Sequence, residues 1–154
     1  MNSSQIKKTK LELLLPLITE ELSAGRSVRF SPNGSSMLPM LREGIDTVVL
    51  SPLKGELKKY DLPLYRRASG QFVLHRIIKT GDTFTCIGDN QYYKEPGVQK
   101  TQMIALVTSF NRNGKEISVN NFWYRVYCRF WHYSRPIRHF TARSIRWMWR
   151  HIKK

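Results

Sequence analysis

The chain is poor in cysteine and has no long apolar run, and each shortage excludes a class of protein. Its 154 residues include two cysteines, Cys86 and Cys128, which are too few for a disulfide framework and lack metal-binding spacing. We therefore expect two reduced thiols. The longest apolar run, residues 13–18, is interrupted by Pro16, whereas a membrane-spanning helix needs about 20 apolar residues. The first ten residues are polar and predict no secretory signal, so we expect a chain that does not span a bilayer.

Acidic residues are missing from the end of the chain. No Asp or Glu follows Glu116, whereas nine Lys and Arg residues and all four tryptophans lie beyond residue 120. The formal net charge of +15 is therefore concentrated in a basic, aromatic tail attached to a nearly balanced body. Such a charge favours anionic partners, which are nucleic acid, acidic lipid or acidic peptide.

Apolar periodicity divides the chain into three parts. Residues 1–25 carry apolar side chains at helical spacing and end at a glycine, which predicts an N-terminal helix. Residues 26–120 contain about seven short apolar segments separated by turn residues, which predicts an all-β barrel-like or sandwich body. One of these strands is expected over residues 71–79. Residues 121–154 have the pattern of amphipathic helices.

Two polar residues are candidates for chemistry. His75 is the only histidine outside the tail, and strand alternation places it on the same face as Val73 and Ile77. It is either a hydrogen-bonded structural residue or a base. Ser36 lies in a loop just after Gly34, which permits close backbone approach. That loop is either an ordinary turn or the site of a nucleophile, because serine needs an adjacent base to react.

Five segments, in order, resemble one family. Residues 34–41, Gly-Ser-Ser-Met-Leu-Pro-Met-Leu, are similar to the Gly-x-Ser-Met-x-Pro-x-Leu nucleophile box of signal peptidases and self-cleaving SOS repressors. Residues 42–49, 60–65, 74–78 and 88–90 resemble the later boxes, with Tyr60 in place of a glycine. Over residues 27–107 the chain thus resembles the S24/S26 serine peptidases, and its histidine matches the archaeal and endoplasmic-reticulum signal peptidases.

The resemblance implies a mainly β fold, a signal-peptidase/SOS-repressor-like coiled antiparallel β-domain with an N-terminal helix and a basic C-terminal helical tail. It implies Ser36 as nucleophile and His75 as general base, with no metal or organic cofactor. The acid that holds the histidine is either Asp89 or Glu95, with Asp89 slightly favoured as part of the Gly-Asp-Asn box. The oxyanion-binding loop would comprise Gly34, Ser35 and Ser36, with Met37 and Pro39 as neighbours of the substrate site.

The tail is a second candidate site. Arginine together with tryptophan on amphipathic helices suits the surface of an anionic membrane. The candidates are Trp123, Trp131, Trp147, Trp149, Arg143, Arg146 and Arg150. Two alternatives stay open: the apolar stripe packs on the β body, or the mixture of aromatic and basic residues binds nucleic acid.

These observations predict a serine endopeptidase that cleaves an extended peptide, in the cytoplasm and peripheral at the inner membrane surface. Its expected partners are a peptide or protein substrate and an anionic membrane surface. The alternatives are an inactive peptidase-like module that docks to a membrane or protein partner, and a nucleic-acid-associated regulator.

Overall fold

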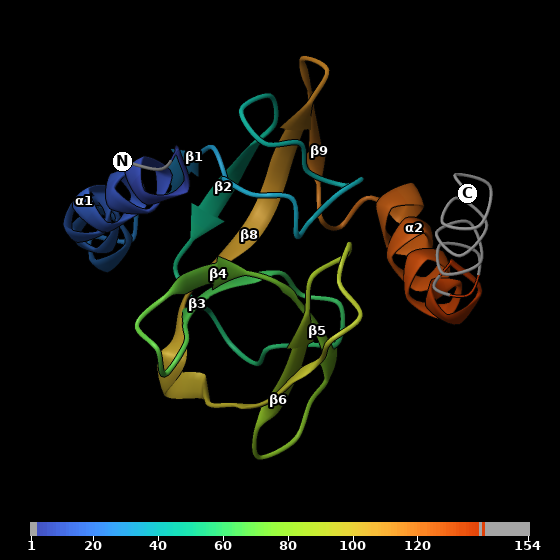
Figure 1. Ribbon diagram of the computed structural model, residues 1–154. Helices are drawn as coiled ribbons and strands as arrows, with labels where there is room; N and C mark the ends of the chain where they lie inside the picture. The colour runs from blue at the N-terminus through green and yellow to red at the C-terminus, as the bar shows by residue number, and fades with distance from the viewer. Residues whose placement is uncertain (1–2, 139, 141–154) are drawn as a thin grey trace, which may run out of the picture.

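The strands form two antiparallel sheets, so the expectation of a mainly β chain is confirmed (Figure 1). The computed structural model describes residues 3–138 and 140. The larger sheet has the order β1 (Val28–Phe30), β2 (Thr47–Ser51), β8 (Met103–Arg112), β3 (Pro63–Arg66), β4 (Phe72–Leu74), with β9 (Lys115–Ser118) also on β8. The smaller sheet has the order β5 (Arg76–Lys79), β6 (Phe84–Ile87), β7 (Glu95–Val98).

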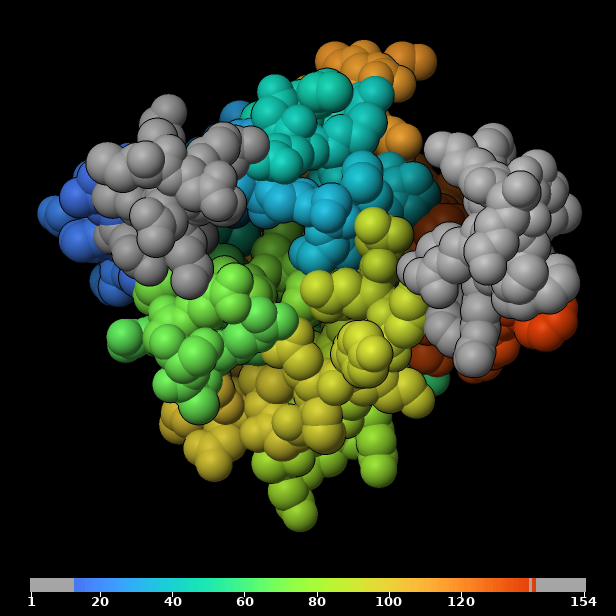
Figure 2. Space-filling model, in the orientation of Figure 1, coloured from blue at the N-terminus to red at the C-terminus, as the bar shows by residue number. Residues whose placement is uncertain are grey.

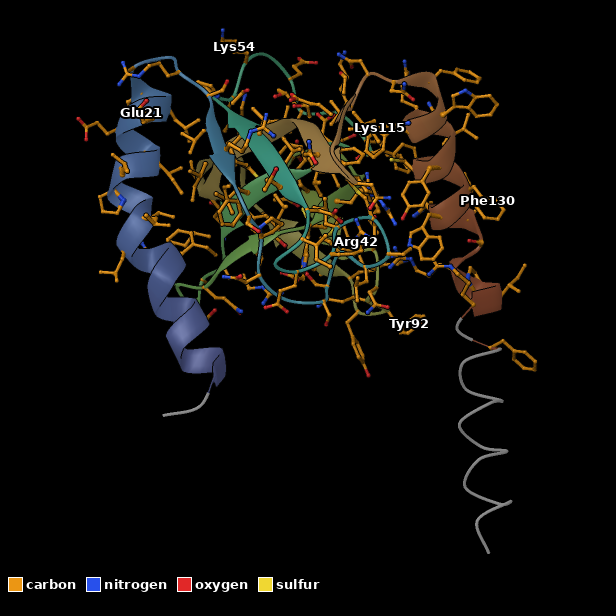
Figure 3. The ribbon with its side chains drawn as sticks, turned by 90° about the horizontal axis from the view of Figure 1, so that it is seen from above. Glu21, Arg42, Lys54, Tyr92, Lys115 and Phe130 are labelled. Atoms are coloured by element: carbon orange, nitrogen blue, oxygen red, sulfur yellow. The ribbon has the colours of Figure 1, made fainter. Side chains whose placement is uncertain are left out.

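Helices α1 and α2 flank this β body on opposite sides (Figures 1 and 3). The N-terminal helix α1 (Ser3–Ser23) packs through the buried side chains of Ile18 and Leu22, and a short 3-10 helix, η1 (Lys100–Gln102), precedes β8. Helix α2 (Phe122–Tyr133) begins after Asn121, whose side-chain oxygen accepts the Tyr124 N–H at 3.1 Å, as expected of an N-cap. Within the described residues, no helix is both long and apolar enough to cross a membrane.

The segment expected as a single strand over residues 71–79 is two strands, and His75 is the residue between them. β4 pairs with β3 in the larger sheet, whereas β5 pairs with β6 in the smaller one. The chain therefore leaves one sheet and enters the other at His75. The sequence pattern hides this change because Leu74 and Ile77 on either side are both buried, so the apolar run looks continuous.

Strand β7 was not expected either. Its residues, Glu-Pro-Gly-Val, include two that are depleted in strands. Because β7 is an edge strand that pairs only with β6 in its sheet, the missing N–H of its proline costs it little there. This strand matters for the site, since Glu95 is its first residue and lies opposite Cys86 of β6.

The apolar interior has two parts, one for each sheet. The larger cluster lies under the six-stranded sheet and includes side chains of both α-helices and Met37, Met40 and Leu41. The smaller cluster surrounds Tyr65 and Ile77. Between them the chain passes through His75, so the candidate base stands where the two sheets meet. Both cysteines are free and buried.

Candidate active site

The loop that carries Ser36 is fixed to the body just beyond that serine. Met37 is buried in the larger apolar cluster, whereas Pro39 is exposed. On the other side, Gly34 adopts φ 93°, in the left-handed region that favours glycine, and Gly34 and Ser35 are exposed. Ser36 itself is half-buried. Met37 is therefore part of the interior, and Ser36 lies between this buried anchor and the surface.

The backbone of Ser36 rests on the turn that follows β6. The Asn90 N–H donates to the Ser36 carbonyl oxygen at 2.8 Å, and the Asn90 side-chain amide donates to the Ser35 carbonyl oxygen at 3.1 Å. In Figure 2 these two segments, far apart in sequence, lie side by side on one face of the molecule. A β-carbon added to Gly88 would lie 2.6 Å from the Ser36 carbonyl oxygen. Glycine at position 88 is therefore required by this close approach.

Gly88→Ala is expected to displace the Ser36 loop. The new methyl group cannot remain 2.6 Å from a backbone oxygen, so one of the two segments must move. We expect a loss of about 1–3 kcal/mol in the free energy of unfolding, the usual range for overpacking, measured by urea denaturation. Gly81→Ala is the matched control, because its β-carbon would make only an ordinary contact of 3.7 Å with the Thr83 carbonyl oxygen. Equal stability of the two variants would contradict the close approach.

Glu95 is the acidic residue that lies against the His75 ring. Its Oε1 is 3.0 Å from Nδ1 of His75, whose side chain is 1% exposed. A carboxylate only accepts hydrogen bonds, so Nδ1 is the donor and carries the ring proton of the neutral histidine. Nε2 is then the unprotonated nitrogen, which is the one that a general base uses to accept a proton.

Two further side chains, which the sequence did not single out, hold the carboxylate of Glu95. The Tyr65 hydroxyl donates to Oε2 at 2.9 Å and Nε of Arg67 donates to the same oxygen at 2.8 Å, while Nη2 of Arg67 donates to Oε1. The Tyr65 hydroxyl is also 3.4 Å from Nδ1 of His75. Tyr65 lies in β3 and Arg67 directly follows that strand, and only folding places them beside β7. The Glu95 carboxylate is therefore oriented by three side chains, those of Tyr65, Arg67 and His75.

Their surroundings lower the pKa values of both His75 and Glu95. Burial lowers the pKa of His75, and the nearby Glu95 carboxylate offsets this only in part. Burial alone would raise the pKa of Glu95, but the hydrogen bonds from Arg67 and Tyr65 and the nearby positive charges outweigh it, so its pKa lies below the usual value. At neutral pH the site therefore holds a neutral imidazole beside an ionised carboxylate.

Asp89, which the sequence slightly favoured as the acid, has a different partner. Its Oδ1 accepts from Nε of Arg76 at 2.9 Å and its Oδ2 from Nη2 at 2.7 Å, and both side chains are buried. Arg76 follows His75 directly, but its guanidinium contacts Met40 and Tyr124 and not the residues around the histidine ring. The sequence could not separate Asp89 from Glu95, because both lie near the same turn and only the fold decides which one faces the ring.

The fold brings Ser36 and His75 to the same end of the smaller sheet. Arg76 is paired with Ile87 across β5 and β6, so His75 and Gly88 follow next on their two chains. Because the Ser36 backbone touches Gly88, the serine loop and the histidine meet at this point. Among the described residues, no hydrogen bond joins the side chains of Ser36 and His75. The Ser36 loop and His75 are thus neighbours across the turn at Gly88, and their side chains are not hydrogen-bonded to each other in the part of the chain that the structure describes.

A surface pocket of about 500 Å³ lies beside this group. It is lined by Arg67, Asn90, Gln91, Tyr92, Tyr93 and Glu95. Glu95 and Arg67 therefore form one wall, and the turn that supports Ser36 forms the other. A peptide ligand with one side chain in this pocket would have its backbone next to the residues that could act on it.

The tail residues are divided between the surface and the body. Trp123 is 74% exposed, as expected for a surface residue. Trp131 differs from the expectation: it is half-buried, and its indole N–H donates to the Asp89 carbonyl oxygen at 2.9 Å, since α2 turns this face toward the body. Trp147, Trp149, Arg143, Arg146 and Arg150 lie outside the described residues.

Taken as geometry, the site has a serine on an anchored loop, a buried histidine at the same place and a carboxylate on Nδ1 of that histidine. Serine–histidine–acid groups occur on unrelated folds, so they are recognised by the roles of the side chains and not by position in the chain. Comparison with protein-family models and with curated proteins finds no match for this sequence.

Proposed function

We propose that the chain is a serine endopeptidase of the signal-peptidase-like S24/S26 type, with Ser36 as nucleophile, His75 as base and Glu95 as acid. The observation that carries the proposal is the 3.0 Å contact between Glu95 Oε1 and Nδ1 of the buried His75. A structural histidine could be satisfied by one neutral acceptor. Here the acceptor is a carboxylate held in turn by Tyr65 and Arg67, which is more than a packing role needs.

The residues have the chemistry for acyl transfer. His75 Nε2 takes the proton of the Ser36 hydroxyl as Oγ attacks the scissile carbonyl carbon, and Glu95 stabilises the imidazolium that results. The tetrahedral intermediate collapses to an acyl-enzyme as His75 gives the proton to the departing amine. Water, activated by the same ring, then releases the acid product and restores Ser36. The backbone N–H of Ser36 is the group that can stabilise the oxyanion.

The substrate proposed is an extended peptide. Edge strands bind extended peptides through their free backbone groups, and β7, which begins with Glu95, is an edge of the smaller sheet. The pocket beside Glu95 would take one substrate side chain. The resemblance to signal peptidases favours small residues before the cut. We place this activity in the cytoplasm, at the inner membrane surface, where the free thiols of Cys86 and Cys128 stay reduced.

Glu95→Gln tests the proposed acid. The amide cannot stabilise an imidazolium as a carboxylate does, so we expect kcat to fall by on the order of 10²–10⁴. The acidic limb of the pH–rate profile reports the pKa of His75, which in the wild type lies below the usual value for histidine because of burial. Removing the Glu95 charge removes an interaction that raises this pKa, so the limb should move to still lower pH. Both are measured on one peptide substrate.

Glu56→Gln is the matched control, since Glu56 is exposed and lies outside the site. It should leave both kcat and the acidic limb unchanged. A Glu95→Gln variant with wild-type kcat would remove Glu95 from the mechanism. A lower kcat with no shift in the acidic limb of the pH–rate profile would indicate a structural effect instead of the proposed electrostatic one.

A peptide-binding module without turnover is the second candidate. The observation that favours it is that, within the part of the chain that the structure describes, Ser36 makes no side-chain hydrogen bond to His75. Such a module would use the same pocket and edge strand. It is distinguished by isothermal titration with a peptide that binds and is recovered uncut after prolonged incubation.

A further inference from the structure

Helix α2 has two faces with different surroundings. Its inner face holds the turn on which Ser36 rests: Trp131 donates to the Asp89 carbonyl oxygen at 2.9 Å, and Arg135, just after the helix, donates to the carbonyl oxygens of Gly88 and Gln91. Tyr124 and Cys128 on the same face are buried. This face is therefore fully used by contacts with the body.

The outer face of α2 is apolar and exposed. Trp123, Phe130 and Tyr133 are 74%, 67% and 68% exposed, and Val126 lies among them. At about 100° per residue these four side chains fall within an arc of roughly 80°, so they form one stripe along the helix. Figure 3 shows Phe130 on the side of α2 that points away from the strands. Large side chains gathered on one exposed face mark an interaction surface.

Positive charge borders this stripe. Arg125 and Arg129 are exposed on the same helix, next to the stripe on one side, and no acidic residue occurs anywhere after Glu116. A soluble partner that covered the stripe would need to be apolar and acidic at once. An anionic bilayer has both properties, with acyl chains beneath a negatively charged surface, and aromatic side chains are favoured at its headgroup level.

We propose that the outer face of α2, formed by Trp123, Val126, Phe130 and Tyr133, docks the protein on an anionic lipid surface. The proposal concerns α2 alone and does not depend on the peptidase chemistry. Its consequence for the site follows from the inner face: a helix is about 10–12 Å across with its side chains, so the turn that supports Ser36 would lie within about that distance of the lipid headgroups. Peptides held at the membrane surface are then the ones within reach.

The test is co-sedimentation of the full chain with phosphatidylcholine vesicles, with and without phosphatidylglycerol. We expect the wild type to bind vesicles with phosphatidylglycerol at least about tenfold more tightly than vesicles without it. The double variant Trp123→Ser/Phe130→Ser should lose about tenfold or more of that affinity, because it removes the two largest side chains of the stripe. Both residues are exposed, so thermal unfolding should match the wild type.

Ile45→Ser is the matched control, since Ile45 is an exposed apolar residue outside α2, in the loop before β2, and this variant should bind as the wild type does. Equal vesicle binding by the wild type and the double variant would overturn the proposal, because the residues after 140 remain intact in both. So would vesicle binding that ignores phosphatidylglycerol. A wild-type dimer that the double variant dissolves, or binding to single-stranded DNA without binding to vesicles, would assign the face to a second copy or to nucleic acid instead.

Discussion

Ser36→Ala and His75→Gln are each expected to reduce kcat/KM by on the order of 10⁴-fold or more, because the proposed acyl transfer fails when either the proposed nucleophile or its proposed base is missing. A peptide library with small side chains before the cut, read by mass spectrometry, supplies the substrate for the measurement. The Ser36 change removes only a hydroxyl from a half-buried side chain, and glutamine keeps a donor for Glu95. Both variants should therefore keep the wild-type unfolding midpoint.

Ser35→Ala is the control that separates the two neighbouring serines. The described contacts of Ser35 are made by its backbone carbonyl, which accepts from the Leu38 N–H and from the Asn90 side chain, and alanine keeps both. We expect cleavage within about tenfold of the wild type, since no proton of the proposed reaction passes through the Ser35 side chain. Full cleavage by Ser36→Ala, or loss only in Ser35→Ala, would refute the assignment of the nucleophile.

Asp89→Ala is expected to have the largest effect on stability. It leaves the Arg76 guanidinium, which is 1% exposed, without its carboxylate, and removing one partner of a buried ion pair costs about 3–5 kcal/mol. Arg76 cannot reach water in compensation, because its remaining donors already face the Tyr60 carbonyl oxygen and the Tyr124 hydroxyl. The measurement is the free energy of unfolding in urea at neutral pH.

The control for Asp89→Ala is an ion pair on the surface. Arg29 and Glu116 are joined at 2.8 Å, but both side chains are about half exposed, so Arg29→Gln should change the unfolding midpoint little. The double change Arg76→Met/Asp89→Leu should recover more than half of the loss, since apolar residues can replace a buried pair. If Asp89→Ala and Arg29→Gln were equally mild, the buried pair would not have the proposed role in stability.

The elements that could be predicted are those whose signals are local. The hairpin between β8 and β9 has such a signal in Asn113-Gly114, a pair typical of hairpin turns, and both residues have positive φ values, 52° and 77°. β7 and the break at His75 could not be predicted, because the first contains residues that disfavour strands and the second is a change of partner within one apolar run. Which strands pair depends on residues far apart in the sequence, so a local pattern does not predict it.

The candidate site was predictable in part for the same reason. Ser36, His75 and Glu95 could be named from residue type and spacing, but their common location depends on the contact of Ser36 with Gly88. Tyr65 and Arg67 were missed because they act on Glu95, which is 28 to 30 residues away in the chain. The signal of Tyr65 in the sequence is an inward tyrosine on an apolar strand. That pattern is equally typical of an ordinary core residue.

Tyr60, the departure from the glycine of the resembled box, has a physical account. Its φ is 78°, in the left-handed region where glycine is preferred, and a side chain there costs about 1–3 kcal/mol. Its amide nevertheless donates to the Ile77 carbonyl oxygen at 2.8 Å, and its ring packs edge-on against His132 of α2 at 5.7 Å between centroids. The tyrosine thus adopts a backbone conformation that glycine would adopt more easily, and its ring adds a contact with the helix.

Arg76 links segments that the chain order keeps apart. Besides Asp89, its guanidinium donates to the Tyr124 hydroxyl and Cys128 Sγ of α2 and to Met40 Sδ just after the Ser36 loop. Proteins open locally in contiguous cooperative units, and opening any one of these segments would leave the buried Arg76 charge without part of its contacts. We therefore expect the serine loop, the turn beneath it and α2 to open as one cooperative unit, so that slow fluctuations that detach the helix would separate the proposed catalytic residues in the same event.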